Sequence, residues 1–342
     1  MSFLVTIRAR APARVSFGGG GTDMEPYCSE HGGAVISTTI SKFTYVTMTS
    51  DLEPDRGTII VNAYDLNQRI EFDVGDYQYN DQVDLVKAVL KHFDVQQPLE
   101  ISIHSDLPPG SGLATSSSLV VALIGACARL QGRSMTRHDI AYLAYKLERE
   151  ELGQRGGYQD QFAATFGGFN YMEFWNRVTV MPLRLSPRML LELRYRLLLI
   201  YTGQTHLSAG IQEQVMAGYE QQQASFLDGM EELKRVTKAI RDLLLDDDMS
   251  SFDAFGTLLH EGWLAKKSLS DRITTEEVEV LYLLARQEGA IGGKLLGAGG
   301  GGHLLLFIDP ARRVELTRKL EELGGIVVPF EFESDGLQVW DY

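Results

Sequence analysis

The chain has 342 residues, of which 44% are hydrophobic and 23% are charged, and its formal net charge is −14. This composition is typical of a folded globular protein and argues against a disordered or fibrous chain. The negative charge argues against a nucleic-acid or anionic-membrane binder, because clustered Lys and Arg capture such partners.

The first half of the chain carries strand patterns followed by helix patterns. Residues rich in Val, Ile, Thr, Phe and Tyr with partial alternation predict strands at 3–17, 34–50, 58–64, 69–74 and 99–105. Longer amphipathic or apolar runs predict helices at 82–93, 113–131, 136–151 and 158–166. A hairpin follows over 167–185, with its turn at Trp175, Asn176 and Arg177.

The pattern breaks at Ser186-Pro187, and the length exceeds what one hydrophobic core usually supports. We therefore predict two domains, 1–186 and 187–342. The second begins with a buried strand at 194–203, continues as a helical region over about 208–288, and reaches a glycine-rich stretch at 289–309. Because strands and helices do not alternate strictly, the expected fold class is α+β.

Two simple site types are disfavoured by the remaining composition. Cys28 and Cys127 show no paired spacing and are interpreted as packing thiols, and the seven histidines form no metal-binding pair. The N-terminal residues lack a signal-peptide pattern, and no stretch reaches the roughly 18 apolar residues of a membrane span. The sequence predicts a cytoplasmic protein without membrane or nucleic-acid partners.

The stretch "PPGSGLATSSSLVVALIGACARL", 108–130, places hydroxyls at the start of a helix that is apolar on nearly every side. The apolar surface predicts burial, so the free N–H groups of the first turn need partners. Ser and Thr could cap them. A glycine-rich loop before a helix also binds phosphate, and a hydroxyl there can bind the accompanying Mg²⁺. Some hydroxyls are therefore expected to serve the helix and others a ligand.

Two common nucleotide signatures are absent from the sequence. Gly293-Lys294 is followed by Leu295, whereas a Walker A loop needs Ser or Thr after its Lys. "GAGGGG", 297–302, runs into a strand pattern where a dinucleotide-binding fold needs a helix. A third glycine-rich stretch, "APARVSFGGGGTD" at 11–23, carries Arg14, Thr22 and Asp23, which suit hydroxylated substrates.

The order of these motifs resembles the GHMP kinase superfamily, named for galactokinase, homoserine kinase, mevalonate kinase and phosphomevalonate kinase. "APARVSFGGGGTD" resembles its first motif, "PPGSGLATSSS" its phosphate-binding second and "KLLGAGGGGHLLLF" its third. "GGGTDMEPYCSEHGGAVISTTI" and "GGYQDQFAATFGGFNY" look most like sugar 1-kinases of the heptose 7-phosphate kinase type. Fucokinases share much of this pattern.

The resemblance implies an N-terminal domain like ribosomal protein S5 domain 2 and a ferredoxin-like C-terminal domain, with ATP and Mg²⁺ bound between them. It implies transfer of the ATP γ-phosphate to the anomeric hydroxyl of D-glycero-D-manno-heptose 7-phosphate. The alternatives are a fucokinase-like or other monosaccharide 1-kinase and a non-catalytic sugar sensor. The expected partner is a small-molecule sugar or sugar phosphate, and a homodimer is compatible with the sequence.

The resemblance also assigns roles to individual residues. The catalytic pair is Asp160 and Arg14, and the magnesium ligands are Ser116 and Glu148. The nucleotide-binding residues are Pro109, Gly110, Ser111, Gly112, Leu113, Ala114, Thr115, Ser116 and Ser117. The substrate-binding residues are Asp23, Thr22, Gly20, Gly21, Gly299 and Gly300.

Two positions depart from the family pattern. Ala114-Thr115 stands where Gly-Ser is common, and His206 stands where Arg is common. The second change weakens a phosphate contact and makes it dependent on pH. The basic residues considered for a sugar phosphate are Lys42, His31, His206 and Arg8.

Overall fold

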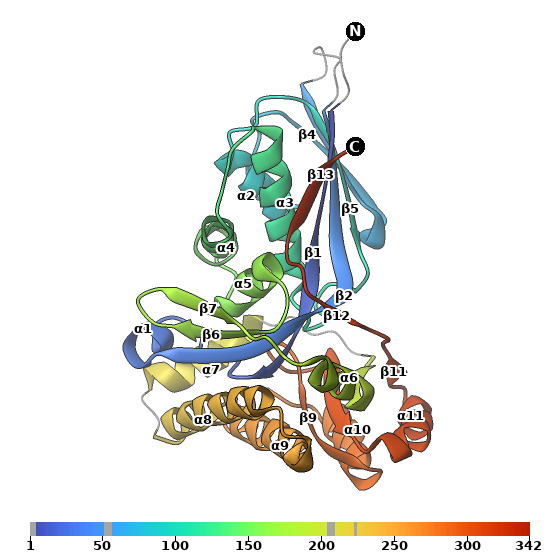
Figure 1. The fold of residues 1–342 in the computed structure, drawn as a ribbon. Helices are drawn as coiled ribbons and strands as arrows, with labels where there is room; N and C mark the ends of the chain where they lie inside the picture. Colours follow the sequence, from blue (N-terminus) through green and yellow to red (C-terminus); the bar gives the residue numbers. More distant parts are fainter. Residues whose placement is uncertain (1–4, 51–56, 204–208, 222–223) are drawn as a thin grey trace.

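The computed structural model describes residues 5–50, 57–203, 209–221 and 224–342 and contains two sheets (Figure 1). The first is nine-stranded, with the order β13-β1-β2-β5-β3-β4 and with β6, β7 and β12 joined through β2. Its strands are β1 (Val5–Gly18), β2 (Gly33–Ser50), β3 (Thr58–Ala63), β4 (Gln68–Asp73), β5 (Leu99–Ser105), β6 (Asn170–Phe174), β7 (Val178–Pro182), β12 (Phe332–Glu333) and β13 (Gln338–Asp341).

The second sheet has four antiparallel strands in the order β11-β8-β10-β9. They are β8 (Leu197–Tyr201), β9 (Ala290–Leu295), β10 (His303–Ile308) and β11 (Ile326–Val327). The α-helices are α1 (Tyr27–His31), α2 (Asp84–His92), α3 (Thr115–Leu130), α4 (Arg137–Tyr145), α5 (Gln159–Phe166), α6 (Pro187–Arg196), α7 (Ala209–Glu220), α8 (Ala224–Asp246), α9 (Asp253–Lys267), α10 (Glu276–Gln287) and α11 (Arg313–Glu322).

The antiparallel pair of β1 and β2 runs through both parts of the fold. The register shifts after Pro12, where two residues of β2 are skipped, and proline in a sheet is tolerated at such an irregularity because it has no N–H to donate. On the other side of β2, residues 44–50 pair with β5 and residues 33–37 pair with β6. The end of β1 and the start of β2 lie near the second sheet, so the first glycine-rich motif, 11–23, is close to that sheet (Figure 1).

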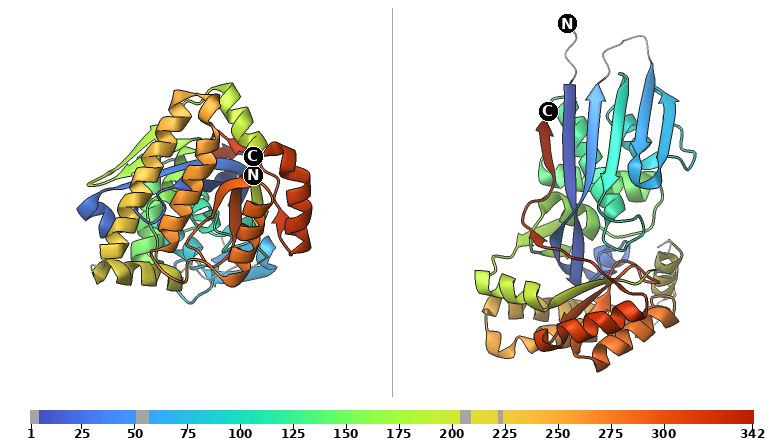
Figure 2. Two further views of the ribbon diagram at one scale, coloured as in Figure 1. Left: turned by 90° about the horizontal axis from the view of Figure 1, so that it is seen from below. Right: turned by 90° about the vertical axis from the view of Figure 1, so that its right-hand side faces the viewer.

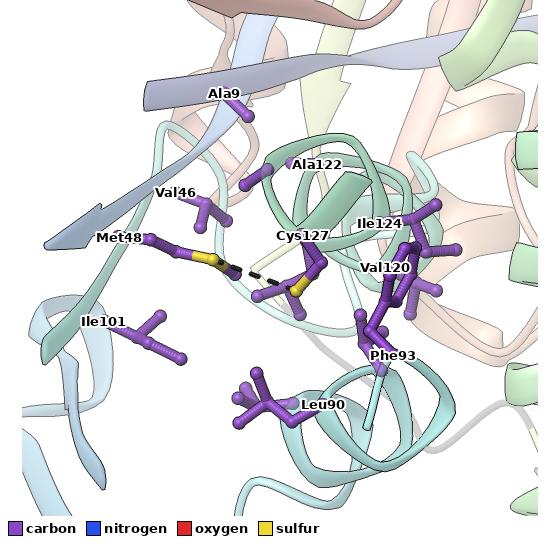
Figure 3. Close-up of a cluster of buried hydrophobic side chains, with 14 of the residues drawn as sticks. Ala9, Val46, Met48, Leu90, Phe93, Ile101, Val120, Ala122, Ile124 and Cys127 are labelled. Carbon is purple, nitrogen blue, oxygen red and sulfur yellow. Dashed lines mark hydrogen bonds between the residues drawn. The ribbon is translucent and has the colours of Figure 1, made fainter. Parts of the chain in front are cut away.

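The upper part of the first sheet in Figure 1 buries α3, which packs on β1 and β2 with α2, α4 and α5 around it. The prediction that this helix is buried is confirmed for its middle part, because the side chains from Val120 to Ile124 have no exposed surface. Cys127 lies in this core with its Sγ 3.9 Å from Met48 Sδ (Figure 3). Burial raises the pKa of the Cys127 thiol to about 12, which agrees with a packing role.

A second core joins the two sheets. Val15, Phe17 and Ile36 from the lower ends of β1 and β2 pack with Phe255 of α9 and Phe307 of β10. Helices α8 and α9 lie side by side beneath this core (Figure 2). The α+β prediction is therefore confirmed. In the described part of the chain, no helix is both long and apolar enough to cross a bilayer.

Two elements differ from the sequence prediction. Ser186-Pro187, interpreted as a break, starts α6: the Ser186 hydroxyl accepts a hydrogen bond from Met189 N, and Pro187 occupies the first turn. The last segment returns to the first sheet, where β13 pairs with β1 and β12 with β2. The prediction that residues up to 342 belong to the second domain is corrected for these two strands, while a boundary near 186 stays a prediction.

Candidate active site

A cavity between the two parts of the fold gathers residues from all three glycine-rich motifs. Its other walls are formed by the π-helical turn 146–151, the start of α5 and one side of α9. The predicted site residues that line it are Arg14, Gly20, Gly21, Asp23, Gly110, Gly112, Ala114, Thr115, Ser116, Ser117, Glu148, Asp160 and Gly299. Motifs far apart in the sequence therefore meet at one place, as the resemblance implies.

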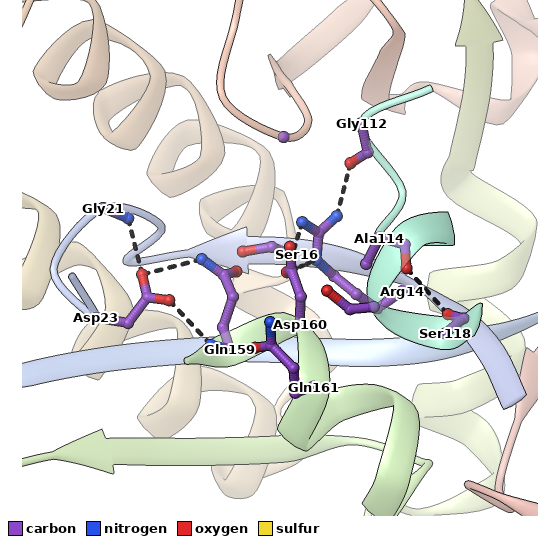
Figure 4. A network of polar contacts seen from close by, with 12 residues as sticks. Arg14, Ser16, Gly21, Asp23, Gly112, Ala114, Ser118, Gln159, Asp160 and Gln161 are labelled. Atoms are coloured by element: carbon purple, nitrogen blue, oxygen red, sulfur yellow. Dashed lines mark hydrogen bonds and ion pairs between the residues drawn. The ribbon is translucent and has the colours of Figure 1, made fainter. Parts of the chain in front are cut away.

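Asp160 lies in the first turn of α5 and faces Arg14 from β1 (Figure 4). Arg14 Nε donates to Asp160 Oδ1 at 2.9 Å, and Arg14 Nη2 lies 2.7 Å from the same oxygen. The Arg14 side chain is 4% exposed and that of Asp160 is 21% exposed. Among the described residues, no hydrogen bond reaches Asp160 Oδ2. The ion pair therefore fixes the carboxylate through one oxygen and leaves the other free for a ligand.

Arg14 also holds the loop that precedes α3. Its Nη1 donates to Gly112 O at 2.6 Å, and its backbone N donates to Leu113 O at 3.1 Å. One buried guanidinium thus links the carboxylate of α5 to the second glycine-rich motif.

The first turn of α3 has no side-chain cap. Its N-cap residue is Ala114, with a φ of 69°, a left-handed conformation that residues with a Cβ seldom adopt. Within the described residues, the backbone N–H groups of Thr115, Ser116 and Ser117 donate no hydrogen bond, whereas Ser118 Oγ lies 2.8 Å from Pro12 O and 3.0 Å from Ala114 O. The helix start therefore offers free amides to an anion.

Three of the predicted nucleotide-binding residues do not line the cavity. Leu113 and Ser111 are fully buried, and Pro109 is exposed outside the lining. Leu113 packs in the core that joins the two sheets, so its side chain anchors the loop. The side chains of these three residues therefore take no part in lining the cavity, while the predicted nucleotide contact of the loop backbone stays a prediction.

The two predicted magnesium ligands, Ser116 and Glu148, are in direct contact. Glu148 lies in the π-helical turn 146–151, a distortion that is frequent at functional sites, and is 1% exposed. Ser116 Oγ donates to Glu148 Oε1 at 2.6 Å, while Ser117 Oγ and Gln161 Nε2 donate to Oε2 at 2.7 and 2.6 Å. This carboxylate and hydroxyl form a hard-oxygen donor set beside the free amides.

The first motif forms a tight turn around Asp23. The Asp23 carboxylate accepts from Gly21 N at 3.0 Å and from Gln159 N and Nε2 at 2.9 and 3.0 Å (Figure 4). Burial raises the pKa of Asp23, and the Gln159 amide opposes the rise. An ionised carboxylate has about four acceptor positions, so one position of Asp23 is unused. Asp23 lines the cavity but has no exposed surface, so its contact with an acceptor hydroxyl stays a prediction.

Thr22 is not placed to contact a substrate. It is fully buried, its Oγ1 lies 2.8 Å from Gly19 O and 3.0 Å from Ala34 O, and it accepts from Ala34 N. The predicted substrate role of Thr22 is therefore corrected to that of closing the turn.

The backbone of the third motif packs against the backbone of the second. A Cβ on Gly297 would lie 2.6 Å from Gly112 Cα, and a Cβ on Gly302 would lie 2.6 Å from Ser111 O. Gly299 lines the cavity, whereas Gly300 does not, and its N–H donates to Ile273 O at 2.9 Å. The substrate prediction is corrected for Gly300. The glycines of this motif let two loops pack backbone against backbone, and Gly297 and Gly301 also line the cavity.

Gly297→Ala is expected to lower the free energy of unfolding by about 2–4 kcal/mol, because it adds steric overlap to the strain of a positive φ of 75°. Gly132→Ala is the matched control, since Gly132 has a φ of 62° and a Cβ added there would meet nothing within 4 Å. That control is expected to lose only about 1–2 kcal/mol. Urea unfolding of both variants measures the difference, and equal losses would contradict the proposed role of the loop contact.

Several basic residues that line the cavity were not predicted from the sequence as site residues. Lys266 on α9, Lys294 on β9 and the arginines at 149 and 155 bring positive charge to the cavity. Lys294 is the first residue of the third motif, which was a usable signal, but nothing in the sequence distinguishes Lys266 from its neighbour. The basic residues considered from sequence, Lys42, His31 and Arg8, do not line the cavity, and His206 lies outside the described residues.

Known proteins show the same organisation. Residues 83–168 match the model of the GHMP kinases N-terminal domain, and residues 233–325 match that of the GHMP kinases C-terminal domain. The chain is 37% identical to a Campylobacter jejuni protein named D-glycero-alpha-D-manno-heptose 7-phosphate kinase, with 98% of this chain and 99% of that relative covered. It is 29% identical to an Arabidopsis thaliana bifunctional fucokinase/GDP-fucose pyrophosphorylase, over 92% of this chain and 31% of that protein.

Solved structures agree with the sequence matches. A Bacteroides thetaiotaomicron structure described as a D-glycero-D-manno-heptose 1-phosphate kinase superposes with a TM-score of 0.80 at 31% identity, covering 98% of each chain. A putative sugar kinase from Campylobacter jejuni superposes with a TM-score of 0.79 at 34% identity and the same coverage. The resemblance inferred from three motifs is confirmed: the chain belongs to the GHMP kinases, a family of phosphotransferases.

Proposed function

We propose that this chain is an ATP-dependent sugar kinase that phosphorylates the anomeric hydroxyl of D-glycero-D-manno-heptose 7-phosphate. Membership of the kinase family implies ATP as the phosphate donor, and the Campylobacter jejuni relative supports the choice of acceptor. The products are the heptose 1,7-bisphosphate and ADP. The arrangement that carries the proposal is a carboxylate with one free oxygen, held by Arg14, in the same cavity as the free amides of α3.

Asp160 Oδ2 is the proposed acceptor of the proton from the anomeric hydroxyl. The hydroxyl oxygen attacks the γ-phosphorus of ATP, the bond from that phosphorus to the β–γ bridging oxygen breaks, and ADP leaves. Arg14 keeps the carboxylate oriented and stabilises negative charge on the transferring group. The amides at 115–117 bind the phosphates of the nucleotide and offset the repulsion from a chain of net charge −14.

Mg²⁺ fits the donor set of Ser116 and Glu148, whose oxygens lie 2.6 Å apart. Magnesium prefers oxygen ligands and usually binds one or two protein groups together with phosphates and water. In the described part of the chain there is no cluster of three or more His, Cys, Asp or Glu side chains suited to a metal. Bound there, the ion would neutralise phosphate charge.

Ser116→Ala is expected to raise the Mg²⁺ concentration needed for half-maximal activity by roughly tenfold, because it removes one proposed ligand. Acceptor affinity is expected to stay unchanged. Ser117→Ala is the matched control, since Ser117 donates to the other oxygen of the same carboxylate. A magnesium titration of both variants tests the assignment, and an unchanged requirement in Ser116→Ala would contradict it.

A coupled assay of ADP release against heptose 7-phosphate, fucose, mannose and galactose tests the substrate. Saturable turnover of the heptose phosphate is expected. Turnover of an unphosphorylated sugar alone would favour the fucokinase-like alternative and overturn the acceptor proposed here. A lack of ADP release with every one of these sugars would favour a non-catalytic sensor, against which stands the joint presence of Asp160, Ser116 and Glu148 in one cavity.

Three sequence-based expectations stay predictions: the cytoplasmic location, the homodimer and the domain boundary near residue 186. The return of β12 and β13 to the first sheet supports a two-domain division in which the N-terminal domain includes the last strands of the chain.

A further inference from the structure

Two buried lysines from the second half of the chain face the cavity and have no part in the mechanism above. Lys266 lies near the end of α9, and Lys294 lies in β9, where the third motif begins. Both line the cavity, with exposed fractions of 7% and 4%. Lysine is rarely buried to this extent unless its ammonium group is paired.

The hydrogen bonds of these lysines are incomplete. Lys266 Nζ donates to Gly297 O, the carbonyl of the third motif. Lys294 Nζ donates to no acceptor among the described residues. An ammonium group has three donors, so several are available to a ligand in the cavity.

Each carboxylate that lines the cavity has partners other than the two lysines. Asp160 is paired with Arg14, the Glu148 carboxylate accepts from two serines and a glutamine, and the Asp23 carboxylate accepts from two residues of its own surroundings. Within the described residues, neither lysine forms an ion pair. The lining carries five basic and three acidic side chains, although the whole chain carries a net charge of −14.

Burial is the main reason why both lysines hold their protons weakly. It lowers the pKa of Lys266 to about 8 and that of Lys294 well below the ordinary lysine range. Repulsion from Arg14 lowers both further, and Lys266 repels Lys294. A bound anion would offset this repulsion, raise the pKa of both lysines and supply the missing acceptors, so both become ammonium groups when a negatively charged ligand group binds.

The residues proposed to bind the nucleotide and those proposed to face the acceptor occupy different parts of the cavity. The free amides of α3 and the Ser116–Glu148 pair lie on the side proposed for the nucleotide. Lys266 comes from the opposite half of the chain, and the charges of Asp23 and Asp160, both proposed to face the acceptor, act on it.

We propose that Lys266 and Lys294 form an anion-binding subsite for the phosphate group that the acceptor carries before the reaction. This inference rests on the proposed function and assigns acceptor specificity to residues outside the catalytic pair. It explains how a net-acidic kinase can select a phosphorylated sugar. The two ammonium groups form charge-assisted hydrogen bonds with the acceptor phosphate, and a neutral sugar offers no such partner.

The test compares Lys294→Met and Lys266→Met with Lys267→Met. Lys267 is the matched control, because it is the next residue after Lys266 and its Nζ is bound by Glu279 at 2.9 Å. Calorimetric titration without ATP measures the binding of heptose 7-phosphate and of unphosphorylated D-glycero-D-manno-heptose. Each cavity variant is expected to weaken binding of the phosphorylated sugar by roughly 10- to 100-fold and of the neutral sugar by less than about threefold. Lys267→Met is expected to change neither.

An equal loss of affinity for the two sugars would overturn the inference. A loss of affinity confined to a non-hydrolysable ATP analogue would also overturn it, because the lysines would then bind the nucleotide. Loss of an unpaired buried ammonium group is not expected to unfold the protein. Lys294→Arg, which keeps the charge, is expected to restore most of the affinity lost in Lys294→Met. Failure of that rescue would also count against a charge-based subsite.

A second probe separates this inference from the proposed function. Inorganic phosphate is titrated into the wild-type protein saturated with Mg²⁺ and the ATP analogue, so that the nucleotide side is occupied. Binding that disappears in Lys294→Met is expected, whereas binding that survives in this variant, or no binding at all, overturns the subsite. Absence of heptose phosphate turnover in the ADP assay contradicts the proposed function whatever the phosphate titration gives.

Discussion

Asp160→Asn is expected to lower kcat by roughly 10²–10⁴-fold, the range that a positioned general base contributes. An asparagine keeps the shape of the side chain, and its carbonyl oxygen can still accept from Arg14 Nε, which lies 2.9 Å from Oδ1 in the wild type. The amide cannot accept the proton of the acceptor hydroxyl. Steady-state kinetics with saturating ATP and heptose phosphate measure the loss.

The binding of both substrates separates proton transfer from misfolding in this variant. Affinity for ATP and for the acceptor is expected to stay within about threefold of the wild type, because the substitution removes a charge and no volume. Asp242→Asn is a suitable control, since Asp242 lies on the surface of α8 and pairs with Arg241. Turnover close to normal would remove Asp160 from its role, and a loss below a hundredfold would mean that Asp160 only orients the hydroxyl.

The features that the sequence predicted well are those that depend on a local pattern of neighbouring residues. The pattern of "LEISIHS" predicted a strand over 99–105, and β5 spans these residues with Leu99 and Ile101 in the core. The apolar surface of α3 predicted its burial in the same way. That the three glycine-rich motifs meet at one cavity was implied by the family resemblance, and glycine suits each of them because their backbones approach other backbone closely.

The features that the sequence missed depend on contacts between distant segments. Thr22 has the hydroxyl of a substrate ligand, but its partners are the backbone of Gly19 and Ala34. Lys266 and Lys267 are adjacent, and only the packing of α9 decides that the first faces the cavity while the second binds Glu279. The pairing of β13 with β1 joins the two ends of the chain, which no local pattern encodes.

Arg14→Met is expected to affect both stability and catalysis, because one buried guanidinium holds two parts of the site. The variant leaves Asp160 without its partner and Gly112 O without a donor. Breaking a buried ion pair costs about 3–5 kcal/mol, and the lower end applies here because the Asp160 side chain is 21% exposed to the cavity. Denaturant unfolding is therefore expected to show a loss of about 3 kcal/mol.

The catalytic loss expected for Arg14→Met is roughly 10²–10³-fold in kcat, as for removal of one preorganised donor facing developing charge. Arg14→Lys keeps a charge but cannot reproduce the forked contacts with Asp160 and Gly112, so it is expected to recover only part of the activity.

The double variant Arg14→Met/Asp160→Asn decides whether the two residues act as a unit. Residues in direct contact show non-additive effects, and here the loss in kcat is expected to be far smaller than the product of the two single losses. The loss of stability is also expected to be smaller in the double variant than in Arg14→Met, because a neutral amide next to methionine leaves no buried charge unpaired. Strict additivity in both measurements would mean that Arg14 acts on the transferring phosphate alone, independently of the carboxylate that it contacts.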